Sequence, residues 1–303
     1  MRRSKGRDHV NRSGPLLHKI IFLFSIFPWL LGISARATEL KPETVAAFDH
    51  YVRITESEME NELEGKQFLV IDRLPEARRK QAYGQLNQGE LYIQEMHTLD
   101  GQELIRIPSG LVHHWAGVIF IPKATLAEVN AVLQDYVNEP RIYNPEIRRA
   151  KLIEQNGNES KVYLQIFSKS IITVVLNGYF NVTLKSIGAA RSESISRSTR
   201  IAEVVNPGDS DEHERTDGND HGYLWRLNSY WRIEEKDGGV YVQNESLTLT
   251  RTVPVLLAWL INPLVKSLPR EVLGDMLTDT RDAVLKQSKV SVVEQEGKKI
   301  KGE

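Results

Sequence analysis

The most constraining feature of this 303-residue sequence is a succession of strand-like segments between residues 147 and 251. Short turn signals separate them, including Asn156-Gly157-Asn158 and Lys236-Asp237-Gly238-Gly239. Strands joined by such turns pair as antiparallel hairpins. An antiparallel sheet of this size has to bury one face, and the largest apolar partner left is the helical segment over residues 269–286. The pattern predicts an α+β fold, a curved antiparallel sheet wrapped around a long C-terminal helix with a cavity between them.

Individual elements follow from the same periodicities. We expect strands over residues 111–121, 147–155, 161–167, 171–185, 192–205, 223–235 and 239–251. Thr125 and Glu128 have the spacing of a capping box, which predicts a short helix after the first of these strands. Ahead of it, residues 42–64 and 76–85 are predicted helices, and residues 68–71, 90–97 and 103–107 are predicted strands.

The N-terminus has the three-part layout of a secretory signal. A basic segment is followed by the apolar run over residues 20–33 and then by Ala35-Arg36-Ala37. The run is shorter than the roughly 20 residues of a membrane span, and Pro28 interrupts it. We expect cleavage after Ala37 and export to a periplasm or cell envelope; the alternative is an uncleaved N-terminal anchor. Cysteine is absent, which excludes disulfides and thiol chemistry.

The predicted domain organisation has four parts. Residues 1–37 form the signal peptide, 38–110 an α/β N-terminal extension, 111–288 the sheet-and-helix domain, and 289–303 a polar tail. The charge of the exported part argues against nucleic acid as a partner. The chain's 39 basic and 40 acidic residues become 32 and 39 once the first 37 residues, with seven basic and one acidic, are set aside. Acidic residues are therefore in excess, whereas binding to a phosphate backbone needs clustered Lys and Arg.

Metal and catalytic motifs are missing from the sequence. His113 and His114 are adjacent on a strand, so they point to opposite faces and cannot share one metal ion. The loop over residues 206–222 is rich in acids and contains two histidines, but a solvated loop is the favoured interpretation because it lacks a metal-ligand spacing. Nucleophile-elbow and phosphate-loop motifs are also absent. We therefore expect no metal and no cofactor, and a binding protein rather than an enzyme.

Three segments carry a resemblance to a known family. They are His113 to Pro122, Leu224 to Trp231 with the hairpin that follows, and Leu249 to Pro254 leading into the C-terminal helix with Thr280-Arg281. In this order they resemble the START-like (SRPBCC, helix-grip) superfamily, and an exported bacterial branch related to polyketide cyclases and coenzyme Q-binding proteins. The resemblance covers about 180 residues. It implies a helix-grip fold and a hydrophobic ligand, and it leaves open whether the protein is a carrier or an enzyme.

Candidate ligand-binding residues follow from strand alternation. In residues 224–234 the more apolar face carries Trp225, Leu227, Ser229, Trp231 and Ile233, which we expect to face the helix and cavity. By the same parity Leu176, Phe180 and Val182 should line the neighbouring wall. We expect Trp259 to close the mouth and Arg251 to bind a polar head group, with a salt bridge to Glu245 as the alternative role for Arg251. Residues 239–251 are ambiguous, because Val240 and Val242 share one face while Leu247 and Leu249 share the other.

Three functions remain open at this point. The first is an exported binding or transfer protein for a hydrophobic small molecule or lipid. The second is a cyclase- or aromatase-like enzyme that acts on a hydrophobic substrate in the same cavity. The third is a structural envelope protein whose core is filled by side chains. The apolar residues 255–261 could also contact a membrane during ligand exchange, although packing in the core is the favoured interpretation.

Overall fold

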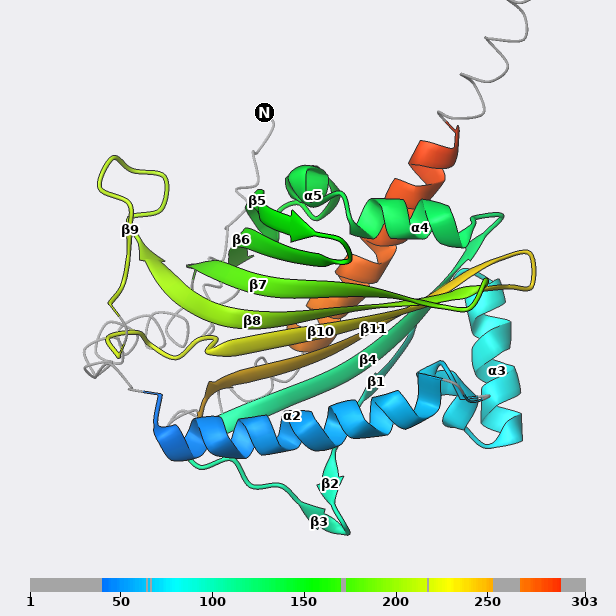
Figure 1. Ribbon diagram of the computed structural model, residues 1–303, viewed down its shortest axis with the longest axis horizontal. Helices are drawn as coiled ribbons and strands as arrows, with labels where there is room; N and C mark the ends of the chain where they lie inside the picture. Colours follow the sequence, from blue (N-terminus) through cyan, green and yellow to red (C-terminus); the bar gives the residue numbers. More distant parts are fainter. Residues whose placement is uncertain are drawn as a thin grey trace, which may run out of the picture. The chain divides into compact units, whose positions relative to one another are not determined.

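A nine-stranded antiparallel sheet is the framework of the computed structural model, which describes residues 40–63, 65, 67–169, 173–216, 218–252 and 268–289. Eight strands follow the order β1-β4-β11-β10-β8-β7-β6-β5, and β9 pairs with β8 (Figure 1). The strands are β1 (Tyr92–Glu95), β4 (Gly110–Pro122), β5 (Ile147–Asn156), β6 (Glu159–Lys169), β7 (Thr173–Ile187), β8 (Arg191–Val205), β9 (His213–Glu214), β10 (Arg226–Lys236) and β11 (Gly239–Arg251). A separate hairpin joins β2 (Leu99–Asp100) to β3 (Glu103–Leu104).

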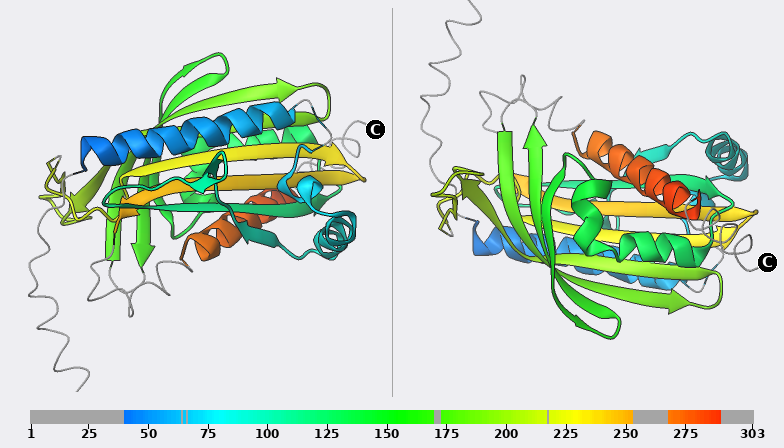
Figure 2. Two further views of the ribbon diagram at one scale, coloured as in Figure 1. Left: turned by 90° about the horizontal axis from the view of Figure 1, so that it is seen from below. Right: turned by 90° about the horizontal axis from the view of Figure 1, so that it is seen from above.

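Helices cover both faces of this sheet. They are α2 (Pro42–Leu63), α3 (Glu76–Asn87), α4 (Leu126–Leu133), α5 (Glu139–Ile142) and a C-terminal helix over residues 268–289, with 3₁₀ turns η1 (Val70–Arg73) and η2 (Tyr136–Asn138). The views in Figure 2 place α2 and the C-terminal helix on opposite sides of the central strands. The capping box predicted for α4 is present, since Thr125 Oγ1 accepts from the Glu128 amide at 3.3 Å.

The C-terminal helix packs against the concave face of the sheet. Leu273, Leu277 and Val284 are buried in one cluster with apolar side chains of β4, β10 and β11. Gly117 on β4 makes this approach possible, because an added Cβ would lie 2.7 Å from Leu277 Cδ1. Roughly 1.5–3 kcal/mol of hydrophobic stabilisation accompanies each such buried leucine or valine. The α+β helix-grip fold predicted from the sequence is therefore confirmed.

Helix α2 covers the opposite face of the same central strands. Phe48, Tyr51 and Met59 form a buried cluster with Tyr230, Leu247 and Leu249 of β10 and β11. These two strands are consequently buried on both faces, and their pairing runs without a register shift. The ambiguity in residues 239–251 arises from this double burial: Val240 and Val242 face the C-terminal helix, and Leu247 and Leu249 face α2.

A buried arginine holds α2 to the sheet. Arg232 on β10 is 1% exposed and donates from Nη1 to Glu62 Oε2 at 2.8 Å and to the Phe68 carbonyl at 3.0 Å. Its Nη2 donates to the Met59 carbonyl at 2.8 Å. Its Nε lies 3.6 Å from Glu193 Oε1. The guanidinium therefore binds the end of α2, the segment after it and β8 at once.

The structure bears on two predictions about residues 38–110. The predicted strand over residues 68–71 is wrong, because the segment ends in the 3₁₀ turn η1, where Asp72 Oδ2 accepts from the Leu69 amide at 2.8 Å. Its four apolar side chains are buried, and a short buried run has no periodicity that separates strand from helix. Residues 38–110 also supply β1, which pairs with β4 of the predicted main domain. Whether residues 111–288 fold alone stays a prediction.

Candidate functional site: a cavity between the sheet and the C-terminal helix

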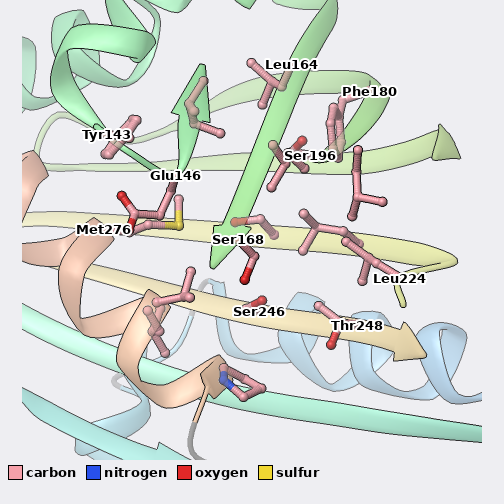
Figure 3. A pocket seen from close by; sticks show the side chains of 18 of the residues that line it. Tyr143, Glu146, Leu164, Ser168, Phe180, Ser196, Leu224, Ser246, Thr248 and Met276 are labelled. Atoms are coloured by element: carbon pink, nitrogen blue, oxygen red, sulfur yellow. The ribbon is translucent and has the colours of Figure 1, made fainter. Parts of the chain in front are cut away.

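A cavity of about 550 Å³ lies between the concave face of the sheet and the C-terminal helix. Its walls are mainly apolar, with Leu164 and Phe180 from β6 and β7 facing Val272 and Met276 from the helix. Figure 3 shows labelled side chains from several strands and the helix around this common space. Ligand cavities of small molecules span roughly 300–1,000 Å³, so the space is large enough for such a molecule.

Four of the predicted ligand-binding residues line this cavity: Leu176, Phe180, Trp231 and Arg251. Leu176 and Phe180 alternate inward along β7, and Val182 continues the same face. Trp231 is 8% exposed and also packs in the buried cluster with Leu273 and Leu277. Their position on the lining agrees with the expected alternation, and their role in binding stays a prediction.

Trp225 is placed differently from the expectation. Its side chain is buried in the cluster beneath α2, with Phe48, Leu247 and Leu249, and it does not line the cavity. Strand β10 begins at Arg226, one residue after Trp225. The alternation of side chains between the two faces, which holds from Leu227 onward, therefore does not apply to Trp225. The indole Nε1 instead donates to Asp220 Oδ1 at 3.0 Å in the loop before the strand.

Arg251 lines the cavity from the end of β11. The predicted alternative, a salt bridge to Glu245, is not formed, because Glu245 accepts from His114 Nε2 at 2.7 Å. The Arg251 side chain has no hydrogen bond or ion pair with any residue that the structure describes. Its guanidinium is thus free, as far as the described chain goes, to meet a polar group of a ligand.

Four other predictions lie wholly or mostly outside the described residues. Trp259, expected at the mouth, belongs to residues 253–267, as does the apolar segment over residues 255–261 for which membrane contact was considered. The signal peptide over residues 1–37 and most of the tail over residues 289–303 are likewise outside the described ranges. Among the described helices, none has the length and hydropathy needed to cross a membrane.

Sequence reasoning missed the polar part of the lining. Six side chains of β8, β10 and β11 that face the cavity are hydroxyl or amide groups: Ser194, Ser196, Ser229, Asn244, Ser246 and Thr248. The signal was present as Ser or Thr at alternate positions from 192 to 198 and from 246 to 250. This signal does not identify the cavity lining from the sequence alone. Leu247 and Leu249 make the other face of the strand apolar, so the sequence does not show which of the two faces meets the cavity.

Two titratable groups of the lining were also missed. His113 hydrogen-bonds through Nε2 with Thr250 Oγ1 at 3.3 Å, and burial lowers its pKa to about 4, so the ring is neutral at physiological pH. Glu139 on α5 lines the cavity as well. Burial, with a smaller contribution from the negative charge of Asp135, raises the pKa of Glu139 to about 8. This carboxyl is therefore mostly protonated at neutral pH and can donate a hydrogen bond.

His114 points to the opposite face, as expected for neighbours on a strand. Its Nε2 donates to Glu245, and its Nδ1 lies 3.0 Å from the hydroxyl of Tyr51, which accepts from the Thr98 amide at 2.8 Å. Burial alone would raise the pKa of Glu245, but the hydrogen bond and charge of His114 hold the pKa below its usual value. The chain of hydrogen bonds is fully satisfied, which is typical of a buried structural network.

The acidic loop before β10 is held by ion pairs. Glu212 pairs with Arg149 at 2.6 Å, and Glu203 binds both His221 Nδ1 at 2.6 Å and the His221 amide at 2.7 Å. Among the described residues, three or more histidine or acidic side chains do not gather in an arrangement that could hold a metal ion. The favoured interpretation of this loop as a surface segment is consistent with these pairs.

Comparison with known proteins gives likenesses at the level of structure. Neither a family model nor a curated protein matches the chain. The STAR-related lipid transfer protein of Xanthomonas axonopodis matches with 17% identity and a TM-score of 0.39, covering 62% of this chain and 98% of that one. The Zhui aromatase/cyclase from Streptomyces sp. R1128 matches with 13% identity and a TM-score of 0.41, covering 60% and 96%. Human STARD10 matches with 11% identity and a TM-score of 0.43, covering 76% and 89%.

The likeness is to START-like proteins. It agrees with the resemblance drawn from the sequence. At these identities and scores it carries no argument about activity, and the description of the helix-grip fold rests on the strand order and on the packing of the C-terminal helix.

Proposed function

We propose that this protein binds a hydrophobic small molecule or lipid in the cavity between the sheet and the C-terminal helix, and carries or stores it. One observation carries the proposal: a space of about 550 Å³ with mainly apolar walls in an otherwise well-packed chain. Protein interiors are normally packed to near-crystalline density, so a cavity of this size beside the core is unusual and supports a binding role. The same void argues against a structural protein with a filled core.

We further propose that the protein acts in the periplasm or cell envelope. The support is the basic, apolar and Ala-x-Ala layout of residues 1–37. The expected mature N-terminus is Thr38, and N-terminal sequencing of the protein from envelope fractions checks it. Recovery of a chain that still begins within residues 1–10 would contradict cleavage.

An enzyme that acts on a hydrophobic substrate is the second candidate. The observation that favours it is Glu139, a cavity-lining carboxyl that is largely protonated at neutral pH and has no side-chain hydrogen bond with a described residue. Such a group could serve as a general acid. The two candidates differ in whether the bound molecule leaves the cavity chemically unchanged.

The test of the proposed function uses the fluorescence of cis-parinaric acid, an 18-carbon polyene fatty acid. The wild-type protein should bind it at a ratio of one to one. Replacing Trp231→Leu removes part of the cavity wall and should weaken binding at least several-fold in protein that remains folded. Trp225→Leu is the matched control, because this second tryptophan lies beneath α2, and its affinity should equal that of the wild type.

Stability measurements separate the two roles of Trp231. If the residue serves only as core, truncation costs roughly 3–5 kcal/mol of unfolding free energy and leaves the affinity of the folded fraction unchanged. Unchanged affinity in Trp231→Leu would remove this tryptophan from the site. Absence of any binding to the wild-type protein would overturn the proposed function itself.

A further inference from the structure

The concave face of the central strands carries a row of serines. Strand pairing places Ser196 of β8 opposite Ser229 of β10, and Ser229 opposite Ser246 of β11. One step deeper, Ser194 and Asn244 flank Trp231 in the same manner. We call the six residues Ser194, Ser196, Ser229, Asn244, Ser246 and Thr248 the hydroxyl platform, and all of them line the cavity.

This composition is unusual for the position. Central strands that face an apolar helix normally carry β-branched and aromatic residues, as β4 does with Ile119 and Ile121. A hydroxyl withdrawn from water without a hydrogen-bond partner is destabilising. The platform therefore needs either bound water or a ligand that offers polar atoms.

Half of the platform's six side chains have a hydrogen bond within the described chain, among them Thr248, whose Oγ1 donates to the His113 carbonyl at 3.5 Å. Asn244 Nδ2 donates to Ser229 Oγ at 2.7 Å. The hydroxyls of Ser194, Ser196 and Ser246 have no hydrogen bond with any residue that the structure describes. Ser194 is only 7% exposed and lines the cavity, so its side chain faces the space that a ligand would fill.

The surroundings of the platform decide which polar groups fit it. Its six side chains are all uncharged, and the neighbouring His113 ring is neutral at physiological pH because its pKa is lowered to about 4. Elsewhere the lining is mainly apolar, with Leu164, Phe180 and Met276, and it includes the acidic side chains Glu139 and Glu146. A carboxylate or phosphate would find no counter-charge on the platform, whereas hydroxyl and carbonyl oxygens would find donors and acceptors on one side and apolar contact on the other.

Resting on the proposed function, we propose that the cavity selects a hydrophobic molecule with at least two uncharged oxygens, hydroxyl or carbonyl, along one edge. Neighbouring strands are about 4.8 Å apart, which sets the spacing of Ser196, Ser229 and Ser246 across the sheet. Oxygens in a 1,3 relation on a six-membered ring have nearly the same separation. Arg251 also lines the cavity, from the end of β11, but it is not one of the six platform side chains.

Isothermal titration calorimetry with three matched probes tests the inference. Pentylbenzene, 3-pentylphenol and 5-pentylresorcinol share the ring and the chain and differ only in having no, one or two hydroxyls. A purely apolar cavity would bind pentylbenzene most tightly, because each hydroxyl loses its hydration on entry. The platform reverses this order, and 5-pentylresorcinol should bind about tenfold more tightly than pentylbenzene.

Variants locate the effect on the platform. The double replacement Ser229→Ala and Ser246→Ala should abolish the preference for 5-pentylresorcinol and leave the affinity for pentylbenzene within about twofold. Ser168→Ala is the control, because Ser168 lines the cavity from β6, away from the three serine-bearing strands, and should keep the preference. The order of the three probes on the wild-type protein needs no variant, so the test holds even if the double variant folds poorly.

The outcomes distinguish this inference from the proposed function. If pentylbenzene binds the wild-type protein as tightly as 5-pentylresorcinol or more tightly, the selection for oxygens is overturned and the proposed function stands. Uptake of cis-parinaric acid without measurable binding of 5-pentylresorcinol has the same meaning. If neither cis-parinaric acid nor any of the three probes binds, both proposals fail.

Discussion

Replacing Arg232→Met should lower the free energy of unfolding by about 3–5 kcal/mol, the typical cost of removing one partner from a buried ion pair. The substitution keeps the length of the side chain but leaves the Met59 and Phe68 carbonyls without their donor. It also deprives Glu193, 3% exposed, of the largest of the positive charges that act on it. Burial already raises the pKa of Glu193, with Arg232 opposing that shift, so the orphaned carboxylate is destabilised further.

Arg197→Met is the matched control for this measurement. Arg197 on β8 pairs with Glu56 of α2 at 2.7 Å, so it also links helix to sheet, but its side chain is 44% exposed. Exposed pairs contribute roughly 0–1 kcal/mol. Urea denaturation of both variants gives the comparison. A loss of less than about 1 kcal/mol in Arg232→Met would mean that α2 is held by its apolar face alone.

Filling the cavity gives the second large effect. Ser196→Phe replaces one hydroxyl of the platform by an aromatic ring on the concave face of β8, where it enters the cavity. Binding of cis-parinaric acid should fall by more than tenfold because the ring occupies the ligand's volume. Stability should be unchanged or higher, since a side chain that fills an existing void adds contacts without forcing its neighbours apart.

The opposite result is expected if no usable void exists. Overpacking a filled core typically costs about 1–3 kcal/mol, so a clear loss of stability in Ser196→Phe would contradict an open cavity. Thr199→Phe is the control, because Thr199 is an exposed residue at the β-bulge of the same strand and does not line the cavity. It adds the same ring to β8 and should leave binding within about twofold of the wild type.

Much of the fold could be predicted from the sequence because its signals are local. The hairpin between β10 and β11 is predicted by its turn residues, and the C-terminal helix by the spacing of Val272, Leu273, Met276 and Leu277. The alternation in residues 171–185 likewise placed Leu176 and Phe180 on the face that lines the cavity. These patterns depend only on neighbours in the chain.

The remaining features depend on distant segments. Strand β11 has apolar residues on both faces because α2 covers one face and the C-terminal helix covers the other. The sequence of residues 239–251 does not by itself reveal that a helix packs on each face. Trp225 sits one residue outside β10, and its placement beneath α2 is fixed by Asp220 and Phe48. The hydroxyl platform needs the register of three strands, so a sequence pattern of alternate serines was insufficient to identify it.

Native mass spectrometry of the protein purified without detergent or organic solvent tests the central claim most directly. The account predicts one hydrophobic small molecule bound per wild-type chain, and extraction should identify an apolar compound that carries uncharged oxygens. The same preparation of Ser196→Phe should show the bare protein mass. A wild-type chain that is recovered bare and that also fails to take up cis-parinaric acid would contradict the account.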